Sequence, residues 1–130
     1  IRFGYHNHDY SFKPMDGVMP QDVMMQATDP SLVDYEMDIF WVVAAGQDPE
    51  EWIKKYPNRF TAGHVKDKTK NTDKISSCIV GEGSIDFKKI LKTAKKNGMK
   101  YFIVEQEEYA TASPIESARK DAEYMKRLSI

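Results

Sequence analysis

Short apolar runs alternate along this chain with segments in which apolar residues recur at helical spacing. Four runs end on residues that can bind a metal or move a proton, and they span residues 3–8, 33–38, 60–64 and 101–105. Strands that alternate with helices imply right-handed βαβ crossovers and a parallel sheet. The carboxyl ends of such strands meet at one edge, where α/β barrels and open α/β sheets place their chemistry. The pattern therefore predicts an α/β protein with a functional site at these four strand ends.

Helix start and stop signals lie between the predicted strands. Asp48 and Ser113 are capping residues followed directly by a proline, and Asp86 precedes a helix that Gly98 ends. Pro20 begins a further helix. The apolar positions of the first three helices are Val23, Met24, Ala27, Trp52, Ile53, Tyr56, Phe87, Ile90, Leu91 and Ala94. The last helix is expected to be buried through Ile115, Ala118, Ala122 and Met125.

Four βα units do not close a barrel, because an eight-unit barrel needs about 250 residues. The order of elements fits either a small open α/β sheet or the carboxyl-terminal half of a TIM (β/α)8 barrel. Two long segments, residues 9–19 and 67–83, follow strands on the side where functional elaboration is expected. Because Ile1 lies inside a predicted strand, we expect a longer protein to begin upstream.

The bulk composition narrows the class of protein. The 130 residues are 41% apolar and 30% charged, with a net charge of −1, which is typical of a soluble globular domain. No basic stripe stands out, so we expect no nucleic-acid partner. Cys78 is the only cysteine, which excludes an internal disulfide and a cysteine-based zinc site. No apolar run approaches the roughly 20 residues that span a bilayer, so we expect no membrane partner.

Two carboxylates at strand ends are candidates for chemistry. Asp38 has no partner in its own strand and needs a cation, a metal or water; capping the following helix is the alternative. Glu105 follows the apolar run 102–104, which we expect to be buried. A carboxylate there costs several kcal/mol unless it is paired or bound to a metal. Its neighbours Glu107 and Glu108 are expected to be solvated.

Imidazole groups end two other strands. His64 is a good ligand for divalent transition metals, although a histidine at a strand end is often a hydrogen-bonded packing residue. Lys66 and Asp67 follow it and add a cation and a second carboxylate. His6 and His8 lie on one side of their strand and suit either chelation or the binding of sugar hydroxyls.

This mixture of oxygen and nitrogen donors suits one divalent metal: Mn, Co, Zn or Mg. Such a metal can hold two adjacent sugar oxygens while a carboxylate removes the proton between them, and the metal stabilises the resulting enediolate.

Five segments, residues 4–10, 36–41, 64–67, 80–87 and 103–106, carry a resemblance to a known family. They occur in the same order and spacing in the xylose-isomerase-like TIM-barrel superfamily, among the sugar phosphate isomerases and epimerases. The resemblance covers nearly the whole chain and corresponds to the last four βα units. It favours the half-barrel, a single partial domain over residues 1–130, and implies that an upstream half-barrel is required. A homo-oligomer is compatible with it.

The resemblance also implies a divalent metal held by Glu, Asp, His and Glu from four successive strand ends. Relatives commonly carry the first Glu shortly after the His-Asn-His motif, where this chain has Ser11. A serine cannot supply the charge of that Glu, so His8 or Asp9 is expected to compensate, or the metal has three protein ligands. The positions that match the other three ligands are Asp38, His64 and Glu105.

Further roles are assigned by position in the same way. Glu105 and Lys66 are the expected catalytic residues. The expected substrate-binding residues are His6, His8, Trp41 and Asp67. Trp41 stands where some epimerases have a His, and either stacking on a sugar ring or burial in the core would explain it.

The expected function is that of a divalent-metal-dependent sugar isomerase or epimerase. One alternative is a lyase or hydrolase of 3-keto-glycosides that uses the same metal and Glu105. Another is a non-catalytic carbohydrate-binding barrel, which Ser11 motivates. An abasic-site nuclease would need more histidine ligands than the three present, and a basic groove.

Overall fold

Four parallel strands form the central sheet of the computed structural model, which describes residues 1–130. The strands lie in the order β1-β2-β3-β6, so the order of strands across the sheet is the same as their order along the chain. This order has no reversal point, which is the arrangement in a barrel and not in a doubly wound sheet. The predicted α/β fold with parallel βα units is confirmed. The strands are β1 (Phe3–His6), β2 (Val33–Asp38), β3 (Phe60–Val65) and β6 (Tyr101–Val104).

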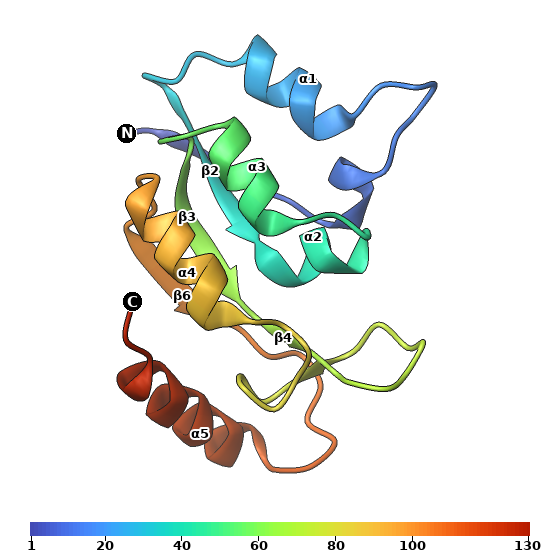
Figure 1. Cartoon of the computed structure of the whole chain (residues 1–130), viewed down its shortest axis with the longest axis vertical. Coiled ribbons are helices and arrows are strands. Elements are labelled where there is room, and N and C mark those ends of the chain that lie inside the picture. Colours follow the sequence, from blue (N-terminus) through green and yellow to red (C-terminus); the bar gives the residue numbers. More distant parts are fainter.

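The helices begin where the capping signals predict. The carboxylate of Asp48 accepts a hydrogen bond from the Glu50 amide at 2.8 Å, and that of Asp86 accepts one from the Lys89 amide at 3.2 Å. Figure 1 shows α3 and α4 in front of the strands, with α1 at one end of the molecule and α5 at the other. The helices are α1 (Pro20–Ala27), α2 (Ile39–Ala44), α3 (Pro49–Lys55), α4 (Phe87–Lys96) and α5 (Pro114–Arg127).

The two long loops contain short elements that the sequence pattern does not predict. The segment after β1 forms a 3-10 helix, η1 (Asp9–Phe12). The segment after β3 forms an antiparallel pair of short strands, β4 (Asp67–Lys68) and β5 (Ser77–Cys78). Both elements follow strand ends, so they lie on the side of the sheet that carries the candidate chemistry.

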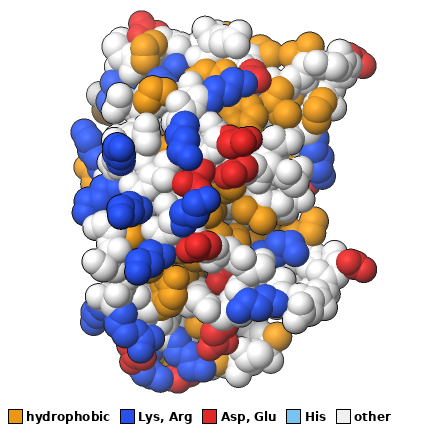
Figure 2. All heavy atoms as spheres, in the orientation of Figure 1, with side chains coloured by type: hydrophobic (Ala, Val, Ile, Leu, Met, Phe, Trp, Pro, Cys, Tyr) orange, Lys and Arg blue, Asp and Glu red, His pale blue; other side chains and the backbone are white.

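The core lies between one face of the sheet and the helices. Tyr35 and Met37 of β2 point into it and are buried. The outer side of α4 is lined by exposed lysines, and the helix side seen in Figure 2 carries many basic side chains with acids between them. No helix combines the length and the apolar character needed to cross a membrane. The core residues supplied by α1 to α4 are Met25, Ile39, Phe40, Val42, Trp52, Ile53, Phe87, Ile90, Leu91 and Ala94.

Two burial predictions are wrong at the end of the chain. Ile103 and Val104 of β6 are 40% and 37% exposed, because β6 is the last strand of the sheet and has a neighbour on one side only. Ile115 of α5 is 81% exposed, and the buried residues of α5 are Ser117 and Asp121. The apolar stripe of α5 instead lines a groove of about 380 Å³ beside Val104, through Ala118, Ala122 and Met125.

Candidate active site

The candidate residues lie on the sheet face opposite to the helices. Because Tyr35 and Met37 enter the core, the alternation along a strand turns Glu36 and Asp38 to the other face. The register places Asp38 directly beside His64 of the next strand. The four predicted strand ends therefore meet at one place.

The carboxylate of Asp38 is the centre of this cluster. Its Oδ2 lies 3.3 Å from His6 Nε2, 3.7 Å from His64 Nδ1 and 4.0 Å from Lys66 Nζ. Glu105 approaches from the neighbouring side, with its Oε2 3.2 Å from His64 Nδ1 and 3.3 Å from Lys66 Nζ. The structure thus brings together the three predicted metal ligands, the predicted catalytic lysine and His6.

Asp38 also holds the strand ends in place. Its Oδ1 accepts a hydrogen bond from the Trp41 amide at 3.2 Å, so it caps α2 as well as facing the cluster. The buried side chain of Asn7 donates to the Asp38 carbonyl and accepts from the Asp38 amide. Burial alone would raise the pKa of Asp38, but its interactions with His64, Lys66 and His6 hold that pKa below the ordinary value. Asp38 is therefore an anion in the folded protein.

His64 lies among three carboxylates. Its Nδ1 faces Asp38 and Glu105, while its Nε2 is 3.4 Å from Oε1 of Glu36. The interaction with Asp38 is the main cause that raises the pKa of His64 above its ordinary value of 6.5, and the charges of Glu36 and Glu105 add to it. A carboxylate on the far nitrogen of a ligating histidine fixes the orientation of the ring. Glu36 has this position, and the sequence pattern did not assign it a role.

The raised pKa of His64 predicts how the stability of the metal-free protein depends on pH. The protonated imidazole is stabilised by folding, so its contribution is complete below the unfolded value of 6.5 and is lost as pH rises through the folded pKa. The melting temperature is therefore expected to fall as pH rises above 6.5. A series of thermal melts in the presence of a chelator measures this, and His64→Gln should flatten the dependence. An unchanged slope in that variant would contradict the assignment.

Lys66 is fully buried although it carries a charge. Its Nζ pairs with Glu105 and Glu107, and it lies 4.8 Å and 5.0 Å from the ring centroids of Phe40 and Trp41. Burial alone would lower the pKa of Lys66, but the hydrogen bond with Glu107 and the neighbouring acids raise it, so the ammonium stays charged. Glu107 is exposed to solvent, as expected, and it also pairs with Lys66.

Glu108 is also engaged, because it joins the segment after β6 to β5 beside the cluster. Its Oε2 accepts hydrogen bonds from the Ser77 amide at 2.7 Å and from the Ser77 hydroxyl. The same hydroxyl accepts from the amides of Glu107 and Glu108. The prediction that Glu108 is solvated is wrong, because its partner comes from β5, a strand that the sequence pattern did not predict.

Asp67 has a different environment from that expected of a substrate-binding residue. It is fully buried, and each carboxylate oxygen accepts two hydrogen bonds from backbone amides. The donors are Lys68, Gly81, Gly83 and Ile85, at 2.8–3.1 Å. These contacts use both oxygens to hold the loop that precedes α4, and we assign Asp67 this structural role.

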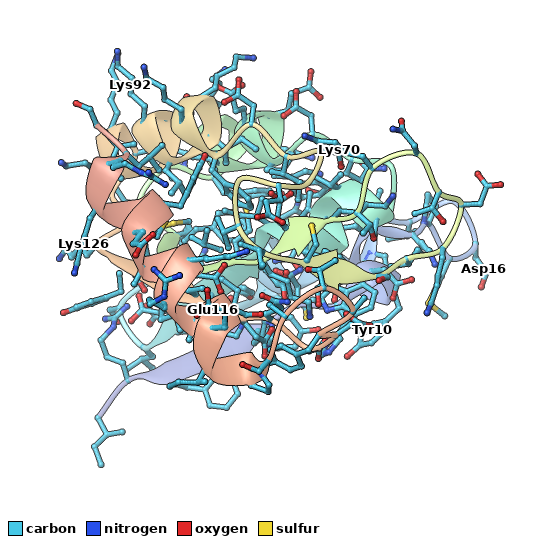
Figure 3. All side chains as sticks on the ribbon, turned by 90° about the horizontal axis from the view of Figure 1, so that it is seen from below. Tyr10, Asp16, Lys70, Lys92, Glu116 and Lys126 are labelled. Carbon is cyan, nitrogen blue, oxygen red and sulfur yellow. The ribbon has the colours of Figure 1, made fainter.

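Aromatic side chains form a wall beside the cluster. The ring of His8 stacks on Tyr10 with a centroid distance of 5.7 Å, and it lies 5.6 Å from Trp41 and 5.2 Å from His6. Tyr10 is 60% exposed, and Figure 3 shows it on the opposite side of the molecule from Lys92 of α4. Exposed rings next to polar groups suit the binding of a sugar. Tyr10 is not among the substrate-binding residues expected from the sequence, and the structure adds it to them as a candidate.

Ser11 stands where relatives commonly carry the first metal-binding Glu, and neither Ser11 nor the neighbouring Asp9 takes that role. Ser11 is buried, and its hydroxyl is 2.9 Å from that of Tyr5, while Asp9 pairs with Lys13. The ligand atoms of His6, Asp38 and His64 all lie within 4.8 Å of one another, which fits a divalent cation. The donor set is therefore present although Ser11 does not contribute to it.

The chain is similar to known proteins in sequence and in structure. The inosose dehydratase of Clostridium perfringens is 35% identical over 122 residues, covering 81% of this chain and 41% of that protein. The inosose dehydratase of Clostridium botulinum is 33% identical, covering 97% and 47%. A crystal structure of a sugar phosphate isomerase/epimerase from Parabacteroides distasonis superposes with a TM-score of 0.83 at 34% identity, covering 97% and 45%.

The chain spans less than half the length of these relatives, so it corresponds to part of their barrel. The sequence model of the xylose isomerase-like TIM barrel matches residues 1–128, which is nearly the whole chain. The order of strands and the site at their carboxyl ends fit the same architecture. The chain belongs to the xylose isomerase-like TIM barrel family.

Proposed function

We propose that the protein containing this chain is a divalent-metal-dependent enzyme that isomerises or epimerises a sugar through an enediolate. The observation that carries this proposal is the convergence of Asp38, His64, Lys66 and Glu105 at the strand ends. Proton removal from a carbon beside a carbonyl needs a base, and a positive charge near the oxygen that becomes negative. This cluster contains both.

The donor set fits a metal on its own chemistry. The pKa of Asp38 is held below its ordinary value, so its carboxylate is an anion. His64 directs Nδ1 at the same region, and Glu105 adds a second carboxylate. A divalent ion bound there would hold two adjacent oxygens of a sugar and stabilise the negative charge that develops on them. The residues that would hold it are Asp38, His64 and Glu105, with Glu105 Oε2 3.2 Å from His64 Nδ1, and His6 lies beside Asp38 and His64.

Glu105 is the candidate base, and Lys66 is its partner. The side chain of Glu105 is 34% exposed, so it can reach a substrate on the open face. Lys66 fixes the Glu105 carboxylate by an ion pair at 3.3 Å and supplies a buried positive charge beside the reacting region. His8 and Trp41 would contact the sugar from the aromatic wall.

Dehydration is a second candidate function, since several relatives are inosose dehydratases. Glu105 would remove the proton next to a ketone and, once protonated, would pass it to the hydroxyl on the next carbon. A C–H and a C–O bond break, a C=C bond forms, and water leaves. The buried ammonium of Lys66, 3.3 Å from the partly exposed Glu105 carboxylate, is the structural observation that favours this reaction, because it stabilises the negative charge that develops beside it.

Substrate trials with the whole protein would separate these functions. We expect stoichiometric divalent metal by elemental analysis, and deuterium incorporation from D2O into a ketose beside its carbonyl. Turnover of a ketone-bearing cyclitol to an unsaturated product, without ketose exchange, would replace the isomerase by the dehydratase. If the protein held no metal and catalysed neither reaction, a non-catalytic carbohydrate-binding barrel would be the remaining hypothesis.

A further inference from the structure

We infer that His6 is a fourth protein ligand of the metal, so that the site consists of two imidazoles and two carboxylates. This inference rests on the proposed metal-dependent function and deepens it. The position of His6 carries the argument: its Nε2 lies 3.3 Å from Asp38 Oδ2, and its ring centroid lies 4.5 Å from that of His64. No other side chain of the first strand is as close to this cluster.

The local structure explains why His6 and not His8 reaches the cluster. β1 ends at His6, which pairs in register with Glu36 of β2, two residues before Asp38. The next residue, Asn7, is buried and bonds to the backbone of Asp38, which holds the end of β1 against β2. Beyond it the chain turns into η1, so His8 is displaced from the strand end.

The other candidates near the first strand are engaged elsewhere. The Ser11 hydroxyl lies against Tyr5, and Asp9 pairs with Lys13 on the surface. His8 stacks on the exposed ring of Tyr10. His6 is the candidate whose ligand atom lies within 4.8 Å of the ligand atoms of both Asp38 and His64.

A site of this composition has a different metal preference from one rich in carboxylates. Imidazole nitrogen suits Zn²⁺, whereas carboxylate, carbonyl and water oxygens suit Mg²⁺ and Mn²⁺. With imidazoles from His6 and His64 and carboxylates from Asp38 and Glu105, the site is expected to favour Zn²⁺ over Mn²⁺ more strongly than the same site with a carboxylate at position 6. Replacing His6 by Asp should therefore change selectivity as well as affinity.

The test uses the whole protein, stripped of metal, and chelator competition to measure Kd for Zn²⁺ and Mn²⁺. His6→Ala is expected to weaken Zn²⁺ binding on the order of 100-fold, and His6→Asp to move the Zn²⁺-to-Mn²⁺ affinity ratio about tenfold toward Mn²⁺. His8→Ala is the matched control, since it removes an imidazole two residues away that faces Tyr10. Its Zn²⁺ affinity should stay within about twofold of the parent protein.

A spectroscopic measurement needs no assumption about affinity. Substitution with Co²⁺ shifts the ring N–H protons of ligating histidines in the proton NMR spectrum. Two such signals are expected in the parent protein and one in His6→Ala. Circular dichroism of each variant establishes that it is folded.

Two results would overturn the inference and are distinguishable. Unchanged Zn²⁺ affinity in folded His6→Ala, with a raised KM for sugar, would make His6 a substrate-binding residue and leave the proposed metal enzyme intact. Failure of the parent protein to bind any divalent metal would remove both the inference and the proposed function.

Discussion

Replacing Glu105 with Gln is expected to lower turnover by about 10³-fold, because a positioned general base contributes 10²- to 10⁴-fold to a proton transfer. The amide has nearly the same shape but has no basicity near neutral pH. In the metal-free protein, the hydrogen bonds that Glu105 accepts from His64 and Lys66 involve one oxygen, which the Gln can still supply. The fold is therefore expected to survive the change.

Steady-state kinetics and deuterium exchange from D2O measure the effect. Because Glu105 is also a proposed ligand, metal content is determined for the variant, and turnover is measured with the metal in excess. Glu82→Gln is a matched control, since the side chain of Glu82 is exposed and forms an ion pair with Lys120, at 3.9 Å, and not with a residue of the cluster. Full exchange activity in metal-loaded Glu105→Gln would assign the base to another residue.

Replacing Asp67 with Ala is expected to lower the free energy of unfolding by about 3–5 kcal/mol. Four backbone amides lose their acceptor at once, and each buried unsatisfied donor costs about 1–3 kcal/mol, reduced where water can enter. Equilibrium denaturation in urea measures the loss. Asp67→Asn keeps one acceptor oxygen and should lose less.

The control for this prediction lies in the same loop. Asp73 is exposed, and Asp73→Ala is expected to change stability by less than about 0.5 kcal/mol. If Asp67→Ala were as mild as this control, the buried hydrogen bonds would not be what holds the loop.

The surroundings of Asp67 also explain a glycine in the segment on which the family resemblance rests. A Cβ added at Gly83 would lie 2.1 Å from Asp67 Oδ1 and 2.4 Å from the Lys68 carbonyl oxygen. The backbone must approach the carboxylate this closely for its amide to donate, so only glycine fits. The glycine of this motif is therefore required by the hydrogen bonds around a buried carboxyl group.

Elements with local signals were predictable from the sequence. Asp48, Asp86 and Ser113 each cap the helix that they precede, because a cap depends only on the following turn. The strand ends at Asp38, His64 and Glu105 were predictable because alternation and parallel pairing place them together.

Features that depend on distant partners were not predictable. The apolar runs of β6 and α5 predict burial, but burial also needs a neighbouring layer, and β6 is an edge strand. Glu107 and Glu108 find Lys66 and Ser77 only because the fold brings two loops together. The choice between His6 and His8 depends on where β1 ends, and alternation places both on the same side.

The paired hydrogen bonds between Asn7 and the backbone of Asp38 join two strands at the point where each presents a side chain to the cluster. His6 and Asp38 consequently keep their separation through backbone contacts, without help from an ion. The loss of conformational freedom that aligns them occurs when the protein folds, so an ion or a substrate arriving later meets a preorganised site. Under the proposed function, Asn7 would thus contribute to affinity at a site that its own side chain does not enter.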